Sequence, residues 1–472
     1  MKMGIIMELP EAFKEKMKNL MGDNYESLLD SYDQPESKGI RTNTLKLSPA
    51  ELANKLPFKT QGVNWCKEGF YIDHEVRPGK NPHYYAGLYY VQEPTAMAAV
   101  EVLDPKPGEW VLDLCAAPGG KSTQIGARLQ GMGVLIANEL VNSRAGILST
   151  NIERMGITNA IVTNEFPERL VDSFYESFDK ILVDAPCSGE GMFRKDPGAL
   201  ADWSLERVDR CMGKQEKILE SAHRLLKPGG VLVYSTCTFS PEENEQMIEA
   251  FIANYPYTLE IFELPGITDH GRVDWTRNNE QDIAKTLRIM PMTVKGEGHF
   301  IARLIKSAVA TDSIETKQGY AKSRLKKATR IELQDYTDFV KNNLESEFYQ
   351  KIEDRLYLLG EHLYAIPAGV ELERIANLKL LRTGLHLGTF KKNRFEPSYA
   401  LAMALKLSES KNVCDLTDEE LAYQYLKGEA LNLKVKKGWV LVGYDGYSLG
   451  FGKASEGLIK NHYPKGLRIR KK

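Results

Sequence analysis

Two cysteines stand in turns rich in proline, serine and glycine, where a thiol could do covalent chemistry. Cys187 lies in DAPCSGEGMFRKDP and Cys237 in VYSTCTFSPEENE, each at the end of an apolar run typical of a buried strand. A thiolate that bonds to a substrate can divide one difficult reaction into two easier steps. A lone cysteine is more often a small buried hydrophobe, and this is the interpretation for Cys66, Cys211 and Cys414.

Charged residues accompany Cys187 in its segment. Asp184 stands at the end of the same apolar run, and Arg194 and Lys195 follow a few residues later. In an open α/β sheet, the carboxyl ends of the strands border the ligand crevice. We therefore expect Asp184 and the two cysteines to face one crevice, with positive charge from Arg194 and Lys195 beside it.

A third segment, VLDLCAAPGGKS at residues 111–122, has the pattern of a buried strand, a turn of small residues and a helix start. Gly119 and Gly120 would let the backbone approach a ligand, and the helix start offers free N–H groups. Cys115 stands where a nucleotide P-loop requires glycine, and no G-x-G-x-x-G is present. The pattern favours a small adenosine ligand with a carboxyl group, whose ribose Glu139 could bind. The alternative is the glycine-rich first turn that any α/β protein can have.

A sheet must bring these segments together, and regular β/α alternation begins at Trp110. Such alternation is typical of a parallel, doubly wound sheet. Ser240 is expected to cap a helix that has Pro241 at its first position. The expected helices cover 205–226 and 242–255, and the seven expected strands cover 110–115, 134–138, 160–163, 180–185, 231–236, 258–262 and 299–305.

Length and charge indicate several domains. The chain of 472 residues is long enough for about three of them. Its 62 basic and 64 acidic residues nearly balance, but Lys and Arg gather at 306–330 and at 453–472. These runs are either a solvated linker and a frayed tail, or contacts to a polyanion. We expect domains at residues 1–100, 101–306, 331–390 and 391–472, with a basic linker at 307–330.

Composition excludes several classes of protein. With 42% hydrophobic and 27% charged residues, the chain can bury sizeable cores. No apolar run reaches the roughly 18 residues of a membrane span, and the N-terminal pattern is not that of a signal peptide. The six cysteines form no C-x-x-C pair and the eight histidines are scattered, so we expect neither a metal site nor a disulfide framework. We therefore expect a cytoplasmic protein with reduced thiols and no membrane contact.

The segments DLCAAPGGKS, DAPCSGEG and YSTC followed by EEN resemble the signature of the Sun family of RNA cytosine-C5 methyltransferases. GIRTNTLK and YYVQEPTAM are similar to N-terminal segments of its bacterial RsmF-type branch, which acts on small-subunit (16S) ribosomal RNA, and residues 438–468 resemble a PUA-type domain. The resemblance implies an α/β fold with a Rossmann-like seven-stranded class I methyltransferase core. An N-terminal α/β RNA-binding extension and a C-terminal PUA-like β-rich domain would flank this core.

The resemblance also implies a role for each reactive residue. Cys237 would be the nucleophile that adds to C6 of cytosine, and Cys187 would assist proton removal and product release. Asp184 would hydrogen-bond the N3/N4 edge of the base, a role that favours a raised pKa. Lys121 would reach the target nucleotide.

For the cofactor, the resemblance implies S-adenosyl-L-methionine. Glu139 would bind its ribose, Asp184 would lie in the same site, and Glu165, rather than Asn164, would lie near the adenine amino group. The family's turn carries over onto Cys115, Ala116, Ala117, Pro118, Gly119, Gly120 and Lys121.

RNA contacts are expected in the N-terminal segment, in the crevice and at the basic tail, and the target cytosine must leave any helix to enter the crevice. Four tyrosines could stack on unpaired bases, or could instead pack between the first two domains: Tyr84, Tyr85, Tyr89 and Tyr90. The expected positive contacts are Arg41, Asn43, Arg194, Lys195 and the basic tail.

Three other functions compete with a ribosomal RNA methyltransferase. The same chemistry could act on transfer RNA, or the chain could be a catalytically silent RNA-binding factor in ribosome assembly. A DNA cytosine methyltransferase would leave Cys237 without a role. We favour a monomer whose partner is ribosomal RNA or the small ribosomal subunit.

Overall fold

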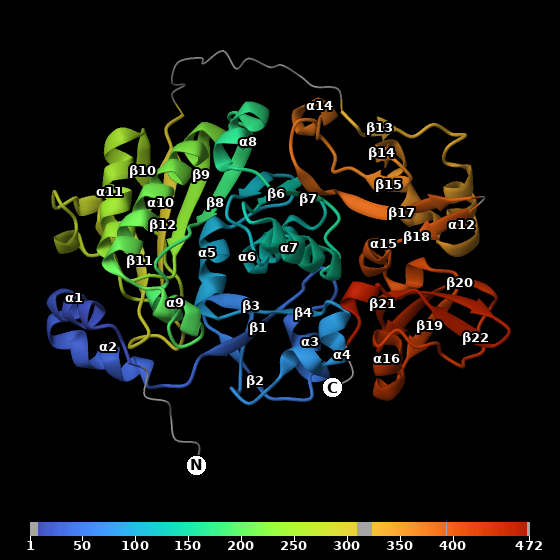
Figure 1. Ribbon diagram of the computed structural model, residues 1–472, viewed down its shortest axis with the longest axis horizontal. Coiled ribbons are helices and arrows are strands. Elements are labelled where there is room, and N and C mark those ends of the chain that lie inside the picture. Colours follow the sequence, from blue (N-terminus) through green and yellow to red (C-terminus); the bar gives the residue numbers. More distant parts are fainter. Residues whose placement is uncertain (1–7, 309–322, 393, 470–472) are drawn as a thin grey trace.

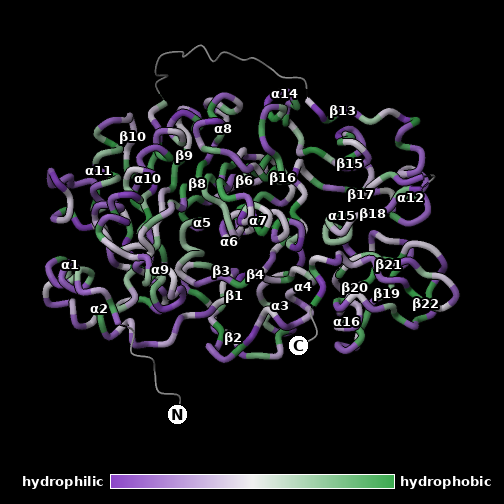
Figure 2. Tube along the Cα trace, viewed as in Figure 1, coloured by the Kyte–Doolittle hydropathy of each residue, from purple (hydrophilic) through white to green (hydrophobic). Residues whose placement is uncertain are grey.

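The computed structural model describes residues 8–308, 323–392 and 394–469, and these form four β-sheets with their helices (Figure 1). Hydrophobic segments concentrate in the strands of the large central sheet (Figure 2). None of the helices in the described ranges is long and apolar enough to cross a membrane.

The central sheet contains all seven predicted strands, which confirms the predicted core. Its first five strands run parallel in the spatial order β7-β6-β5-β8-β9, and β12 and β10 complete it in antiparallel pairing. The strands are β5 (Trp110–Asp113), β6 (Val134–Asn138), β7 (Ala160–Thr163), β8 (Phe178–Asp184), β9 (Leu226–Thr236), β10 (Tyr257–Leu259) and β12 (His299–Lys306).

Two further strands bring this sheet to nine, so the expected count of seven was incomplete. The short β11 (Leu287–Ile289) pairs with β12, and β16 (Leu380–Thr383) pairs antiparallel with β7. Because β16 comes from the C-terminal part of the chain, no local β/α alternation could have predicted it. It attaches that part of the chain directly to the core.

Helices cover both faces of the central sheet because alternate strand residues point to opposite sides. Val111 packs with α5, α6 and α7, whereas Leu112 packs with α8, α10 and α11. Ser240 is not a side-chain cap, since its hydroxyl donates to Glu190 and a 3₁₀ turn (Pro241–Glu243) precedes α11. The helices are α5 (Ala98–Leu103), α6 (Gly120–Leu129), α7 (Asn142–Arg154), α8 (Pro167–Phe174), α9 (Pro197–Ala201), α10 (Leu205–Leu225) and α11 (Glu245–Asn254).

The N-terminal part is a four-stranded antiparallel sheet with two helices ahead of it. Its strands follow the order β2-β3-β1-β4, and its elements are α1 (Glu11–Met21), α2 (Tyr25–Tyr32), β1 (Lys38–Thr42), α3 (Pro49–Lys55), β2 (Thr60–Val63), β3 (Cys66–Ile72), α4 (Pro82–Tyr85) and β4 (Tyr89–Val91).

Arg41 and Asn43 join this sheet to the core, so their prediction as RNA contacts was wrong. The Arg41 side chain is buried, and its guanidinium donates to the Gly120 carbonyl and the Thr123 hydroxyl, each at 2.8 Å. The Asn43 amide donates to two backbone carbonyls, those of Gly87 and Met155. A polar pattern alone cannot distinguish such buried connectors from surface contacts.

The C-terminal part holds two smaller sheets. The first, in the order β13-β14-β15-β17-β18, begins at Lys326 and ends at Pro397, so the expected divisions at 330 and 390 cut through it. Part of the expected basic linker, 309–322, and the basic residues 470–472 lie outside the described residues. The elements are β13 (Lys326–Lys327), α12 (Gln334–Asn343), α13 (Ser346–Gln350), β14 (Leu356–Leu359), β15 (His362–Ala365), α14 (Leu372–Ile375), β17 (Leu385–Lys391) and β18 (Arg394–Pro397).

The last sheet is built around the predicted glycine-rich hairpin. Asp445 and Gly446, both with positive φ, turn the chain between β20 and β21, as two-residue hairpin loops require. The elements are α15 (Tyr399–Ala404), β19 (Val413–Leu416), α16 (Glu419–Leu426), β20 (Gly438–Tyr444), β21 (Tyr447–Ser455) and β22 (Leu458–Asn461).

Candidate active site

The two predicted cysteines meet at one edge of the central sheet. Strands β8 and β9 run parallel with Asp184 opposite Ser235, so the loops that follow them start side by side. Each loop carries one cysteine, and the sulfur atoms of Cys187 and Cys237 lie 3.3 Å apart as free thiols. Parallel pairing thus brings together two residues that are fifty positions apart in the chain.

Two buried glutamates fasten these loops to each other. Glu190, in the Cys187 loop, accepts hydrogen bonds from the Phe239 N–H at 2.8 Å and the Ser240 hydroxyl at 2.7 Å. In return, Glu243, in the Cys237 loop, accepts from the Ser188 N–H at 2.9 Å and from the Ser188 hydroxyl. We call this pair of glutamates the loop clasp. It fixes the relative position of the two cysteine loops.

The surroundings of Cys187 keep its thiol protonated. The hydrogen bond with Cys237 and burial raise the pKa of Cys187 well above its usual range, and the charge of Glu243 adds to this rise. Cys187 therefore stays a thiol at neutral pH, and its S–H can donate to the Cys237 sulfur.

Asp184 lies beside the cysteines and is held by two donors. Lys121 Nζ is 2.7 Å from one carboxylate oxygen, and the Ser235 hydroxyl is 2.8 Å from the other. Burial alone would raise the pKa of Asp184, but the charge of Lys121 and the hydrogen bonds from Lys121 and Ser235 together lower it. The expected raised pKa was therefore wrong: Asp184 is a carboxylate, and Lys121 contacts it directly.

His299 is a residue at this edge that sequence reasoning missed. The Thr95 hydroxyl lies 2.9 Å from its Nδ1 and donates its only hydrogen to Glu93, so Nδ1 must be the donor to Thr95. Burial lowers the pKa of His299 to about 4, so the ring is neutral and Nε2 is an acceptor. The position of His299 in the sequence could have identified it. His299 is the first residue of a strand that runs antiparallel to the others, so it lies at the edge where the parallel strands end.

The glycine-rich segment forms the predicted strand, turn and helix between β5 and α6. Gly119 has a φ of +111°, a conformation that disfavours side chains. The Ala116 N–H donates to the Asn138 carbonyl at the end of β6. Glu139 follows directly, buried, with one oxygen bound by the Val141 N–H at 2.8 Å.

Asp113, also missed, lies buried beneath this turn. The Ser122 hydroxyl donates to one oxygen at 2.6 Å, while the other has no partner among the described residues. Burial raises the pKa of Asp113 to about 7. With Glu139 and Asp184 it supplies carboxylates around a turn open to close approach, and these fit S-adenosylmethionine, which carries a sulfonium and an ammonium.

Glu165 sits at the far end of this edge, next to the added strand β16. One of its oxygens accepts from the Lys379 N–H at 2.7 Å, and the other pairs with Arg169 at 3.2 Å. The Asn164 amide donates to the carbonyls of Glu139 and Leu140. The C-terminal part of the chain thus supports this corner, and the adenine contact stays a prediction.

Several expected RNA contacts are buried instead. Arg194 is 7% exposed and pairs with Glu297 at 2.8 Å, so its prediction as an RNA contact was wrong. Tyr89 and Tyr90 are buried, which favours the packing alternative for both, and Tyr84 lies 4.0 Å from the Arg154 guanidinium. Lys195 is exposed and lines a groove of about 410 Å³ together with Lys38, Arg77 and Lys80.

One group of possible metal ligands occurs within the described ranges, formed by Cys66, Glu68 and Glu101. Arg128 contacts both carboxylates, so a positive charge already lies beside them.

Comparison with known proteins agrees with this geometry over nearly the whole chain. The model of the 16S rRNA methyltransferase RsmB/F family matches residues 100–305. Models of three RsmF domains match further ranges: the N-terminal domain at 9–94, the first C-terminal domain at 338–405 and the PUA domain at 411–469.

Curated relatives and solved structures extend this result. Ribosomal RNA small subunit methyltransferase F of Vibrio campbellii is 34% identical and covers 97% of each chain, and that of Shewanella loihica is 34% identical over 92% and 90%. A methyltransferase homolog protein from Pyrococcus horikoshii shares 31% identity with a TM-score of 0.57, covering 64% of this chain and 96% of that one. NSun6 from the same organism, at 23% identity and a TM-score of 0.55, shares the fold over 64% of this chain and 99% of that one. The chain therefore belongs to the RsmB/F family of 16S rRNA methyltransferases and has the domains of its RsmF branch.

Proposed function

We propose that the protein transfers a methyl group from S-adenosylmethionine to C5 of a cytosine in 16S ribosomal RNA, through a transient bond between Cys237 and C6. The observation that carries this proposal is the 3.3 Å approach of two free thiols at adjacent strand ends. The ionised Asp184 beside them provides a partner for the base. The names of the relatives support the RNA substrate.

The chemistry requires a nucleophile because C5 of cytosine is too weakly nucleophilic to accept a methyl group unaided. Cys237 loses its S–H proton to solvent as its sulfur bonds to C6, and the electrons of the C5–C6 double bond shift towards C5 and N3, which takes up a proton from solvent. When bound, S-adenosylmethionine supplies the electrophilic methyl group. Asp184, kept ionised by Lys121, accepts hydrogen bonds from the cytosine amino group and from protonated N3.

Cys187 serves the last step, in which the C5 proton leaves and the C6–sulfur bond breaks. Its thiol donates a proton to the departing Cys237 sulfur and takes up the proton released from C5. The double bond between C5 and C6 re-forms, N3 loses its extra proton, and the pair of cysteines returns to its starting protonation. This role uses the raised pKa of Cys187, which keeps it protonated until that step.

The residues that would hold the cofactor lie along the ends of β5 and β6. The turn from Cys115 to Lys121 would approach it through backbone atoms, and Glu139 would accept the ribose hydroxyls. Asp184 offers negative charge to its cationic groups, Asp113 has an oxygen without a partner in the described structure, and Glu165 would reach the adenine.

The test measures methyl transfer from labelled S-adenosylmethionine to 16S RNA and to the small subunit, with wild type, Cys237→Ala and Cys187→Ala. Denaturing gels detect a covalent protein–RNA band, and digestion of the RNA identifies the methylated nucleoside. We expect Cys237→Ala to be inactive without a band, and Cys187→Ala to be slow and to accumulate one. Exchange of these two results would make Cys187 the nucleophile. Methylation of transfer RNA alone would refute ribosomal RNA as the substrate.

A further inference from the structure

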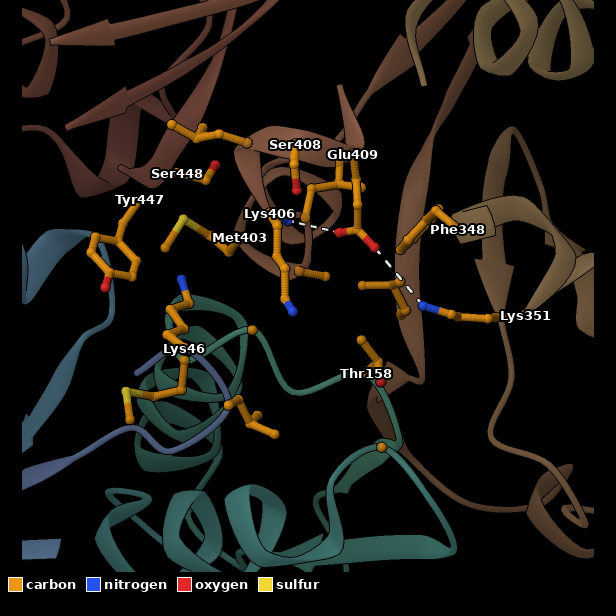
Figure 3. Close-up of a pocket in the computed structure, with 18 of the residues that line it drawn as sticks. Lys46, Thr158, Phe348, Lys351, Met403, Lys406, Ser408, Glu409, Tyr447 and Ser448 are labelled. Carbon is orange, nitrogen blue, oxygen red and sulfur yellow. Dashed lines mark hydrogen bonds and ion pairs between the residues drawn. The ribbon is translucent and has the colours of Figure 1, made fainter. Parts of the chain in front are cut away.

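A cavity of about 940 Å³ lies where the four parts of the chain meet (Figure 3). Gln130 and Met132, which precede β6, and Thr158, which precedes β7, line its floor. These residues are at the amino ends of the strands, whereas Cys187 and Cys237 follow carboxyl ends. The cavity is therefore separate from the candidate active site and lies at the opposite edge of the central sheet, where the strands begin.

Positive charge exceeds negative charge in the cavity lining. Lys55 pairs with Asp445 at 2.7 Å, and Lys351 lies 3.9 Å from Glu409. The remaining cations include Lys46, from the N-terminal part, and Lys406, after α15. Among the described residues neither ammonium group has a carboxylate partner, and Glu409 accepts from the backbone N–H of Lys406, at 2.8 Å. Figure 3 shows the Lys406 amine directed into the middle of the cavity.

Lys46 is a partly buried ammonium that lacks an anion. Its Nζ donates one hydrogen bond, to the Ala86 carbonyl at 2.6 Å, so two of its N–H groups have no partner in the described structure. Burial and the charge of Arg154 lower the pKa of Lys46 to about 7. Because an unpaired buried charge is costly, a bound anion would relieve this site.

Ser448 provides a second, independent sign of a missing ligand. It lies on β21, is 2% exposed and lines the cavity, yet its hydroxyl has no hydrogen-bond partner among the described residues. Buried polar side chains are rarely left unpaired in native proteins. Ser448 and Lys46 come from different parts of the chain and appear on the same side of the cavity in Figure 3.

The apolar part of the lining suits an organic group rather than a bare ion. Phe348, Met403 and Leu405 line the same space, and its volume is in the range of about 300–1,000 Å³ usual for small-molecule sites. We propose that this cavity binds a phosphate ester, with Lys46 and Lys406 facing the phosphate and the apolar residues facing the attached nucleoside. The source is either a free nucleotide or a nucleotide within an RNA strand.

Binding to the full-length protein tests this proposal. Saturating S-adenosylhomocysteine is present throughout to block the cofactor site, and the probes are 5′-AMP, adenosine and a fluorescent single-stranded oligouridylate. The variants are Lys46→Met, Lys406→Met and the milder Ser448→Ala. Lys436→Met is the matched control, because Lys436 is exposed on the same C-terminal part but does not line the cavity.

We expect each lysine variant to weaken binding of a phosphate-bearing probe about 10-fold, the loss of one charge-assisted hydrogen bond. Ser448→Ala should weaken it less, and Lys436→Met should match wild type. Adenosine should bind at least about 10-fold more weakly than 5′-AMP. Binding of 5′-AMP assigns a nucleotide site, and binding of the oligonucleotide alone assigns an RNA site. Equal binding by wild type and all cavity variants, or no binding of either phosphate probe, would overturn the proposal. Methyl transfer is not part of the readout, so failure here leaves the proposed catalytic function standing.

Discussion

Replacing Glu243 by glutamine tests the loop clasp through the pH dependence of stability. The ordinary pKa of a glutamate is 4.5, and burial raises that of Glu243 to about 7. Between these values the folded protein binds a proton that the unfolded chain releases. This contribution to the free energy of unfolding is therefore complete below pH 4.5 and is lost as pH rises through 7.

The expected size follows from these two values. At 1.36 kcal/mol per pKa unit, the wild type should lose about 2.5 kcal/mol at this residue between pH 5 and pH 8. Glutamine is neutral at both pH values, and its amide oxygen can still accept from the Ser188 N–H and from Gln215. The variant should therefore keep its fold and lose this part of the pH dependence.

Urea unfolding of wild type and Glu243→Gln at pH 5 and pH 8 measures the difference. Other buried acids, including Asp113, are present in both proteins and cancel. Glu242→Gln is the matched control, since Glu242 is the neighbouring residue, is 33% exposed and pairs with Lys16; it should follow the wild type. Parallel loss of stability in wild type and Glu243→Gln would mean that Glu243 is ionised at both pH values and would refute the reasoning.

Three further predictions concern residues that the tertiary structure assigns to the site or the core. Lys121→Met should raise the pKa of Asp184 and move the acidic limb of the pH–rate profile for methyl transfer to higher pH. If the limb stays at the same pH, Lys121 does not lower the pKa of Asp184. His299→Asn keeps a donor to Thr95 but removes the acceptor Nε2. We expect kcat to fall about 10-fold in steady-state kinetics, which is less than the loss usual for a general acid or base, and cofactor affinity to stay unchanged in a titration. Arg41→Ala leaves buried acceptors unpaired and should lower the free energy of unfolding by about 3 kcal/mol. RNA affinity of the folded variant should keep its salt dependence, and a shallower salt slope would restore Arg41 as an RNA contact.

Local patterns in the sequence were sufficient for the core and for the two cysteine loops. Strands with near-continuous apolar runs, separated by helices, can form only a sheet covered on both faces. Parallel order then places the turns after consecutive strands at one edge. For this reason Cys187, Cys237 and Asp184 could be assigned to one crevice from the sequence alone.

Tertiary structure alone decided which charged side chains face solvent and which are structural. Arg41 and Arg194 have the same local signals as surface arginines, but carbonyls and a carboxylate from distant segments bury them. The clasp between Glu190 and Glu243, the place of His299 and the addition of β16 to the core likewise depend on contacts between residues far apart in the chain. Short-range periodicity and turn chemistry predicted seven strands of the central sheet and the two cysteine loops, because these depend on neighbouring residues. Protonation states, buried partners and the cavity between the four parts depend on which surfaces meet, and only the folded chain brings those surfaces together.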